Sequence, residues 1–290
     1  MREIFIVNPK AGKGQAVNAI NELDASQKRK IIIPKNSQDA TLLTMKESQS
    51  EEPTIIYSVG GDGTLNAVLN GIVGSKALLG VIPLGSGNDF YRTLQEEKEY
   101  ITPIDIGRLN YDYFINVASV GIDANVARNV IKNRERFKIS SYALAIIEEL
   151  LKRNKEISIT TDNVNQQVTM LAVCNGRYYG NGIKIAPTAS IHDGKFDIYQ
   201  VDSLKKMELV KLVLQLLKNE HEKSPFVVKQ ILEELKFIAY EPDALYVNLD
   251  GEVKSFHSFD FEVVKDGVKV ITDCPSDVKR LVYQINRKKM

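Results

Sequence analysis

Apolar and polar positions alternate in two different ways along the chain, and the first third shows the pattern of strands separated by helices. Short apolar runs are typical of buried strands, and longer amphipathic runs are typical of helices. The strand-like runs are 4–7, 30–33, 55–59 and 79–83, and the helix-like runs are 15–23, 39–47 and 65–72. This alternation predicts βαβ units and therefore a parallel sheet.

The pattern changes after the strand-like segment 104–107. Short alternating runs follow with few helices between them, in YFINVASVGI, EISITTD, QVTMLAVCNG, KFDIYQV, ALYVNLDGE and SFDFEVV. Such strands are typical of an antiparallel sandwich or barrel. Helix-like segments interrupt this region at 141–153 and 206–219, and another follows at 276–286.

The segment KMELVKLVLQLLKN at 206–219 is apolar on more than one face. It is too short and too charged to span a bilayer. The pattern is compatible with a helix that covers a sheet and with a helix that lies on a membrane surface. We favour the helix that covers a sheet.

Composition and charge narrow the class of protein further. The 290 residues are 43% hydrophobic and 26% charged, as in ordinary soluble globular proteins of one large or two smaller domains. The net charge of +1 provides no global field that would attract nucleic acid. Because no signal peptide or membrane-spanning run is evident, we expect a cytoplasmic protein without a transmembrane segment. Cys174 and Cys274 lack a metal-ligand or redox spacing, so we expect two reduced thiols.

Three glycine-containing loops carry the first candidate chemistry. They follow predicted parallel strands and read NPKAGKG at 8–14, GGDGT at 60–64 and GSGND at 85–89. Ligands of open α/β sheets bind at the carboxyl ends of the strands, and glycines let backbone N–H groups approach phosphate oxygens. The loops therefore predict a nucleotide site. Neither the dinucleotide fingerprint nor a Walker loop is present.

Longer motifs resemble a known family. VNPKAGKG, VGGDGTLNAVLNG and GVIPLGSGNDFYRTL, followed by IDIGRLN, FINVASVGID, CNGRYYGNGIKIAPTASIHDGKFDIYQV and LDGE, are similar to motifs of the bacterial diacylglycerol kinase-like lipid kinases. The resemblance extends over nearly the whole chain. It implies an N-terminal α/β nucleotide domain of the NAD kinase and phosphofructokinase type and a C-terminal β-sandwich lipid domain. The implied boundaries are 1–107 with 276–290 for the first domain and 108–275 for the second.

The resemblance also implies the nucleotide-binding residues. Asp62 would help to hold a catalytic Mg²⁺, directly or through water, while the surrounding backbone follows the ATP phosphates. The positions that match the family's nucleotide-binding motifs are Asn8, Pro9, Lys10, Ala11, Gly12, Gly60, Gly61, Asp62, Gly63, Thr64, Asn66 and Ser86.

A second acidic motif, NLDGEV, contains Asp250 and Glu252. In a continuous strand both side chains would share a face, whereas Gly251 also permits a tight turn. By resemblance, Glu252 is the general base that activates the lipid hydroxyl group and Asp250 is its orienting partner.

A third motif, SIHDGKFD, could be a simple turn. The resemblance implies a structural Mg²⁺ held by Asp193 together with Ser190 and Lys195, largely through backbone oxygens. We interpret the lone histidines His192, His221 and His257 as surface residues.

Two positions depart from the family pattern. Ala67 occupies a position where many relatives have glutamate, and Pro34–Lys35 occupies a place where relatives often have a nucleotide-contacting threonine. The basic segment KNRERFK at 132–138 could contact a membrane, although we favour a solvated charged loop for it.

Taken together, the motifs predict an ATP- and Mg-dependent kinase that phosphorylates a lipid at a membrane surface, most simply diacylglycerol. A kinase of a soluble substrate, such as an NAD kinase, shares only GGDGT. A catalytically weak nucleotide- or lipid-binding protein is the alternative that Ala67 raises. Strand edges of the second domain could also pair in a homodimer.

Overall fold

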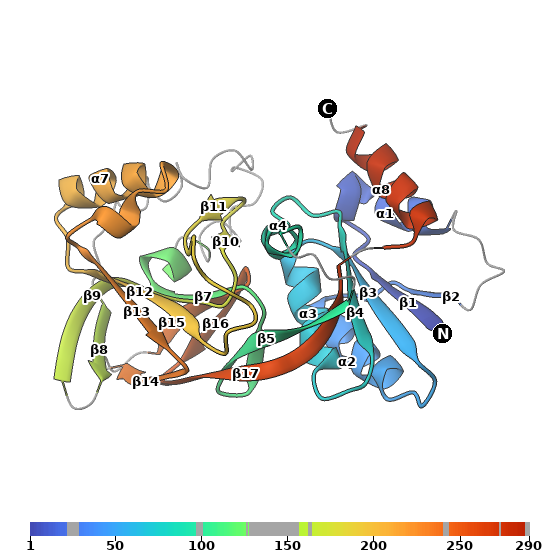
Figure 1. The fold of residues 1–290 in the computed structure, drawn as a ribbon, viewed down its shortest axis with the longest axis horizontal. Helices are drawn as coiled ribbons and strands as arrows, with labels where there is room; N and C mark the ends of the chain where they lie inside the picture. Colours follow the sequence, from blue (N-terminus) through green and yellow to red (C-terminus); the bar gives the residue numbers. More distant parts are fainter. Residues whose placement is uncertain are drawn as a thin grey trace. The chain divides into compact units, whose positions relative to one another are not determined.

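The fold of the chain divides into two units (Figure 1). Unit 1 comprises Met1–Ile106 and Lys265–Met290, and unit 2 comprises Gly107–Val264. The computed structural model describes residues 1–21, 29–96, 101–125, 127, 157–161, 164–239, 244–272 and 274–287. Two strands run from one unit into the other, namely β5 (Ile101–Leu109) and β17 (Ser258–Ile271).

Unit 1 contains the parallel sheet that the alternation of strands and helices predicts. Its strands, in the order β4-β3-β1-β2, are β4 (Leu78–Pro83), β3 (Thr54–Gly60), β1 (Arg2–Val7) and β2 (Arg29–Ile32). Every residue of β3 is buried, because a parallel sheet of this type is covered on both faces. The end of β17 joins the sheet parallel to β4, where Val270 pairs with Leu79.

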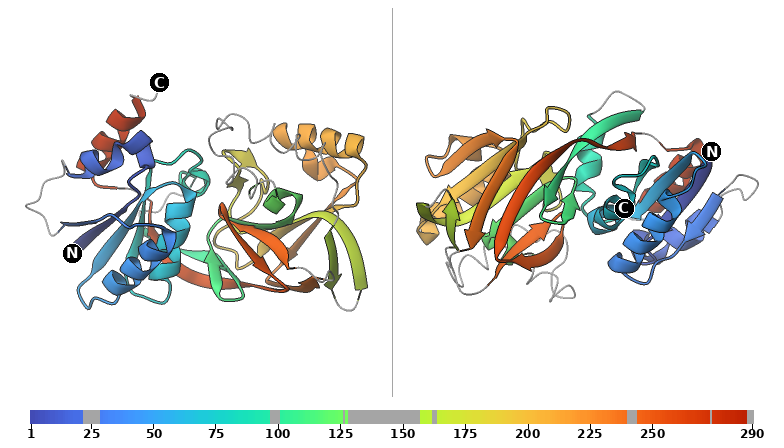
Figure 2. Two further views of the ribbon diagram at one scale, coloured as in Figure 1. Left: turned by 180° about the vertical axis from the view of Figure 1, so that it is seen from behind. Right: turned by 90° about the horizontal axis from the view of Figure 1, so that it is seen from below.

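Helices cover both faces of this sheet (Figures 1 and 2). On one face, α1 (Ala16–Asn21) and α8 (Ser276–Arg287) share a core with Phe5 and Tyr57, whose rings stack 4.9 Å apart. On the other face lie α2 (Ser37–Ser48) and α3 (Asp62–Ile72), and α4 (Asp89–Leu94) follows β4. The α2 helix begins earlier than its apolar pattern predicts, because the Asn36 side chain caps it by accepting the backbone N–H of Asp39.

Unit 2 is built from antiparallel strands. They are β6 (Asp112–Phe114), β7 (Val117–Gly121), β8 (Ile157–Thr161), β9 (Val164–Cys174), β12 (Phe196–Asp202), β13 (Val227–Leu232), β14 (Glu234–Ala239), β15 (Leu245–Leu249) and β16 (Glu252–Phe256). The order is β16-β15-β7-β9-β8-β14-β17, and β12 pairs with both β9 and β13. A separate hairpin joins β10 (Tyr178–Tyr179) to β11 (Ile183–Lys184).

An aromatic core holds these strands together. Its fully buried phenylalanines come from β6, β12 and β17, and Phe237 of β14 stacks on Phe259 with ring centroids 4.6 Å apart. A second apolar cluster lies beneath α7 (Lys206–Leu217), which leads into the short helix η3 (His221–Lys223). The fold class predicted from the sequence, α/β followed by an all-β part, is confirmed.

Some elements differ from the sequence predictions. Strands β13 and β14 were not expected, because most of their side chains are exposed and the alternation of apolar and polar positions is weak there. The predicted helix at 141–153 and the basic segment 132–138 lie outside the described residues.

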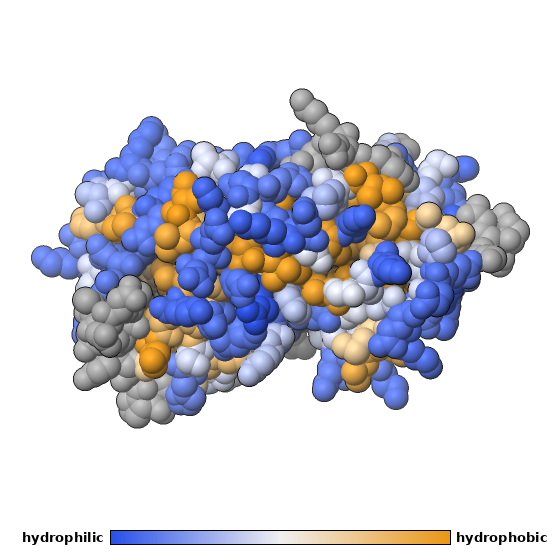
Figure 3. Space-filling model, turned by 60° about the horizontal axis from the view of Figure 1, so that its bottom comes forward, coloured by the Kyte–Doolittle hydropathy of each residue, from blue (hydrophilic) through white to orange (hydrophobic). Residues whose placement is uncertain are grey.

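Hydrophilic and hydrophobic residues are interspersed on the face drawn in Figure 3. Among the described helices, none has both the length and the apolar character that crossing a bilayer would require. Cys174 and Cys274 are free thiols, as expected, and burial raises the pKa of the Cys174 thiol well above its ordinary value.

Candidate active site

The three predicted glycine loops meet at the carboxyl ends of the parallel strands. The N–H of Gly12 donates to the Leu84 carbonyl oxygen at 2.9 Å, and the N–H groups of Leu84 and Gly85 both donate to the Gly60 carbonyl oxygen at 2.9 Å. The loop after β1 is therefore bonded to the loop after β4, which is bonded to the end of β3.

One contact between these loops requires glycine at position 85. A Cβ atom added to Gly85 would lie 2.2 Å from the Cα of Gly61. No side chain fits at that distance, so Gly85 is needed for the close approach of the two backbones. A Cβ atom on Gly61 would lie 3.1 Å from the Cα of Gly85, which is tight but less restrictive.

Asp62 is the first residue of α3 and ties that helix to the start of α4. Its Oδ1 accepts the backbone N–H of Asp89 at 2.8 Å and that of Phe90 at 3.5 Å. The first turn of a helix offers N–H groups without intrahelical partners, and a carboxylate is a favourable acceptor there. Asp62 therefore organises the loop as well as carrying charge.

A second carboxylate lies beside Asp62, which the sequence analysis did not identify. A methyl group placed on Gly87 would come within 2.7 Å of Asp62 Oδ2 and 3.5 Å of Asp89 Oδ2. Two carboxylates that face one small residue offer oxygen atoms of the kind that Mg²⁺ prefers as ligands. The acid in GSGND was the available signal.

The side chains of Asn8 and Asn66 form hydrogen bonds within the protein. The Oδ1 of Asn8 accepts the backbone N–H of Lys10 at 3.0 Å, and its Nδ2 donates to Thr64 Oγ1 at 3.2 Å. Asn66 is buried, and its Oδ1 accepts from Asn70 Nδ2 at 3.3 Å. In this arrangement both asparagines shape the loops.

The remaining predicted nucleotide positions differ in exposure. Pro9, Lys10 and Ser86 are exposed, whereas Ala11 and Gly12 are buried. The three exposed residues can contact a ligand directly. Ala11 and Gly12 instead lie beneath the loop surface.

In unit 2, the acidic motif forms a tight turn. Asp250 and Gly251 have φ values of 50° and 95° and join β15 to β16, with Leu249 paired to Glu252. These left-handed conformations are those of a two-residue hairpin that favours Asp-Gly. The alternative of a continuous strand, in which both acids share a face, is therefore wrong.

The two acids have different surroundings. The buried carboxylate of Asp250 accepts three backbone N–H groups, from Ile115 at 2.8 Å and from Asn116 and Val117 at 3.0 Å. Glu252 is only partly buried. Asp250 is thus fixed as an anchor for the segment before β7, while Glu252 is more accessible.

A buried polar network links this hairpin to a neighbouring segment. Asp123, only 2% exposed, accepts a hydrogen bond from Ser119 Oγ and one from Asn248 Nδ2 at 3.1 Å. The Oδ1 of Asn248 accepts the N–H of Gly251 at 2.9 Å. Sequence analysis missed this network because its members are far apart in the chain.

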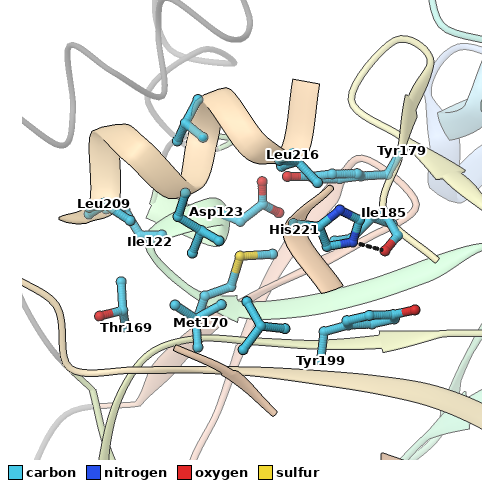
Figure 4. A pocket seen from close by; sticks show the side chains of 14 residues that line it. Ile122, Asp123, Thr169, Met170, Tyr179, Ile185, Tyr199, Leu209, Leu216 and His221 are labelled. Carbon is cyan, nitrogen blue, oxygen red and sulfur yellow. Dashed lines mark hydrogen bonds between the residues drawn. The ribbon is translucent and has the colours of Figure 1, made fainter. Parts of the chain in front are cut away.

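Asp123 also lines a cavity of about 70 Å³ beneath α7. Figure 4 shows Leu209 and Leu216 on one side of the cavity and Met170 and Tyr199 on the other. Apart from a few polar groups the lining is apolar, which suits a hydrocarbon chain.

The prediction that His221 lies on the surface is wrong. Its side chain is buried against the cavity, where Nε2 contacts the Ile185 carbonyl oxygen at 2.8 Å and Nδ1 has no hydrogen-bond partner among the described residues. Burial lowers the pKa of His221, and its hydrogen bond to Ile185 only partly opposes this effect. His192 and His257 are exposed, as predicted.

The predicted structural metal loop lies between β11 and β12. Ser190 Oγ accepts the N–H of His192 at 3.3 Å, and Asp193 Oδ1 accepts the N–H of Lys195 at 3.1 Å. Within the described part of the chain, no group of three His, Cys, Asp or Glu side chains is arranged to hold a metal. A site at Ser190, Asp193 and Lys195 would depend on backbone oxygens, and it stays a prediction.

The two departures from the family pattern have structural roles. Ala67 is buried, and its carbonyl oxygen accepts a hydrogen bond from Thr41 Oγ1 at 2.9 Å. Pro34 is buried, and the N–H of Lys35 donates to Asp39 Oδ2 at 2.8 Å at the start of α2.

Comparisons with known proteins agree with the division of the chain into two units. The diacylglycerol kinase catalytic domain matches residues 2–110, and the YegS C-terminal NAD kinase beta sandwich-like domain matches residues 116–272. The chain is 31% identical to diacylglycerol kinase of Bacillus subtilis (strain 168) over 225 residues, which cover 71% of this chain and 74% of that protein.

A second relative covers almost the full length. Diacylglycerol kinase of Staphylococcus carnosus (strain TM300) is 28% identical over 301 residues, which cover 96% of each chain. The fold matches the crystal structure of a diacylglycerol kinase from Bacillus anthracis str. Sterne with a TM-score of 0.67 at 22% identity, over 94% of this chain and 97% of that one. The chain therefore belongs to the diacylglycerol kinase-like family of lipid kinases, which are phosphotransferases.

Proposed function

We propose that this protein transfers the γ-phosphate of Mg-ATP to the hydroxyl group of diacylglycerol, which gives phosphatidic acid. The observation that carries the proposal is the network in unit 2 that joins the apolar cavity to the acidic hairpin. Asp123 lines the cavity and is bonded through Asn248 to Gly251, between the two candidate catalytic acids. A site for a lipid chain is thus connected to a site for its hydroxyl group.

The loops of unit 1 would bind the nucleotide. Phosphoryl transfer depends mainly on alignment and on neutralising charge, and not on covalent chemistry by the protein. Asp62 and Asp89 would hold Mg²⁺, which when bound offsets the charge of the phosphate groups. Lys10 and Ser86 are exposed at the same strand edge and would contact the phosphates.

Glu252 would accept the proton of the acceptor hydroxyl group. A carboxylate is a weak base for an alcohol, so this transfer would come late, after the bond to the γ-phosphate has loosened. Asp250 would act through structure, because its carboxylate oxygens already accept three backbone N–H groups.

The cavity would receive part of an acyl chain. Its volume of about 70 Å³ is smaller than the roughly 150 Å³ that holds one benzene molecule in an engineered protein. A long chain would therefore extend beyond the cavity or displace α7.

The test is the transfer of labelled γ-phosphate into mixed micelles that contain diacylglycerol. We expect the parent protein to form phosphatidic acid and Asp62→Asn to lose roughly two or more decades of kcat, because the variant weakens the metal site and the loop together. Asp39→Asn is the matched control, since Asp39 also accepts a backbone N–H, from Lys35, but lies at α2.

Other outcomes would contradict the proposal. Phosphorylation of NAD in place of diacylglycerol would indicate a kinase of soluble substrates. ATP binding without turnover of any lipid in a panel would indicate a binding protein. Equal activity of the parent and Asp62→Asn would remove the role assigned to Asp62.

A further inference from the structure

The inner face of helix α7 is apolar because it packs against the strands beneath the helix. Leu209, Leu212 and Val213 are buried in the cluster beneath the helix, and Leu216 lines the cavity. This face confirms the interpretation that the helix covers a sheet.

The helix also has an outer apolar face without such a role. Met207 is 79% exposed, Leu214 is 51% exposed and Leu217 is 48% exposed. A single exposed apolar side chain is ordinary, but several on one helix indicate a contact surface.

Lysines lie along the same face. With about 3.6 residues per turn, positions separated by four, seven and eleven residues fall on one side of a helix. Met207, Lys211, Leu214 and Lys218 have this spacing, and both lysines are exposed. The outer face of α7, defined by Met207, Lys211, Leu214, Leu217 and Lys218, is therefore apolar and basic.

A comparison with α2 shows what is particular about this face. Leu42 and Met45 are also exposed on α2, but the charged residues of that helix are Asp39, Lys46 and Glu47. On α7 the acid is Glu208, whose carboxylate accepts the N–H of Lys205 at 2.8 Å at the start of the helix. Of these two described helices, α7 is the one whose surface combines exposed apolar side chains with excess positive charge.

We propose that the outer face of α7 docks the protein on a membrane whose surface carries anionic lipid headgroups. The apolar side chains would enter the boundary between headgroups and acyl chains, and the lysines would reach the lipid phosphates with their aliphatic stems against the apolar layer. A second copy of the chain is a poorer partner, because a symmetric contact would bring like charges together.

The docking surface rests on the proposed function, since it specifies how that enzyme meets its acceptor. The inner face of α7 walls the cavity, so one helix would contact the bilayer on one side and the lipid chain on the other. A lipid that leaves the bilayer would have a short path to the cavity.

Vesicle sedimentation without ATP tests the proposal. The full chain is mixed with vesicles of phosphatidylcholine alone or of phosphatidylcholine with phosphatidylglycerol. We expect binding only to the anionic vesicles, a loss of roughly tenfold or more in partition for M207S/L214S, and a loss of roughly fivefold per lysine for K211Q/K218Q. The matched control, L42S/M45S, removes a similar exposed pair from α2 and should bind within about twofold of the parent.

Circular dichroism and gel filtration accompany each variant to confirm folding and oligomeric state. Equal binding to both vesicle types, unchanged binding by M207S/L214S, or an equal loss in the control would overturn the docking surface. A dimer that M207S/L214S converts to a monomer, with vesicle binding unchanged, would identify a second copy as the occupant and would also overturn it.

These outcomes are separable from the kinase reaction. A protein that phosphorylates diacylglycerol in micelles but does not bind anionic vesicles would refute the docking surface and leave the proposed function standing. A protein that binds these vesicles through α7 but phosphorylates no lipid would do the reverse.

Discussion

The candidate nucleotide site in unit 1 and the candidate acceptor site in unit 2 are built by different means. In unit 1, backbone groups of three short motifs make the site, and Gly61 and Gly85 bring two loops into contact. In unit 2, side chains from distant segments make it, and Asp123 meets Asn248 across 125 positions of sequence. Short motifs reveal the first kind of site, and only contacts reveal the second.

Sheet type explains the difference. The carboxyl ends of parallel strands all lie at one edge of the sheet, so loops that follow those strands must converge. In an antiparallel sheet the strand ends alternate, and the residues that meet depend on pairing register. The pairing of β15 with β7, Asn248 opposite Ser119, is what brings the acidic hairpin beside Asp123.

The largest expected effect separates the two acids of the hairpin. We expect Glu252→Gln to lower kcat by roughly two decades or more, because the base is lost, while the free energy of unfolding changes by less than about 0.5 kcal/mol. Asp250→Asn should destabilise the protein by about 1–3 kcal/mol, because an amide nitrogen would then face a backbone N–H. Kinetics in micelles and urea unfolding measure both quantities.

If both substitutions lowered activity without changing stability, Asp250 would have a chemical role, and the contrast between the acids would fail. If Glu252→Gln retained full activity, another group in unit 2 would have to accept the proton.

A smaller effect tests whether the loops of unit 1 work through backbone contact. Gly85→Ala should cost about 3 kcal/mol of stability and lower nucleotide affinity by roughly tenfold or more, because the new methyl group overlaps the Gly61 backbone. Gly74 has a φ of 80° but open space around it, so Gly74→Ala should cost only about 1–2 kcal/mol. Titration calorimetry with ATP and thermal unfolding would distinguish the two.

In that comparison Gly74→Ala should keep the parent's nucleotide affinity. Equal affinities for both variants would show that crowding between the loops does not shape the nucleotide site.

The smallest effect concerns acid stability, in which the units should differ. Burial holds the pKa of His221 below its ordinary value of 6.5, so the unfolded chain binds the proton more readily and unit 2 loses stability as the pH falls below 6.5. In unit 1, the hydrogen bond from Arg29 holds the pKa of Asp277 below 3.8, so that contribution is lost only at lower pH. Urea unfolding between pH 7 and pH 3 would follow both losses.

Two variants test whether the loss of stability near pH 6 comes from His221. His221→Gln should flatten the dependence near pH 6, whereas His257→Gln, at an exposed histidine, should not. A steep loss near pH 6 that survives His221→Gln would have to come from another group.

Much of this molecule could be predicted from local pattern, and the errors are equally local. Strands β1 to β4 and helices α1, α2, α3 and α8 of unit 1 were predicted from their apolar runs, whereas the short helix α4 was not. By contrast, β13 and β14 were missed because their side chains are largely exposed, and a lone His221 carries no sign of burial in its neighbours. Asp89 was overlooked as a partner of Asp62 because its backbone contact joins two separate loops.

The sequence by itself determined the α/β and all-β halves, the three glycine loops and the lipid kinase family, because apolar periodicity and contiguous motifs are local properties. Only the tertiary structure decided that Asp250 anchors a turn, that Asp123 and Asn248 connect the cavity to that turn, and that α7 keeps an apolar, basic face exposed. These features depend on which distant residues meet and which remain uncovered. Strand register and packing determine which residues meet and which stay exposed. No single segment of the chain specifies either of them.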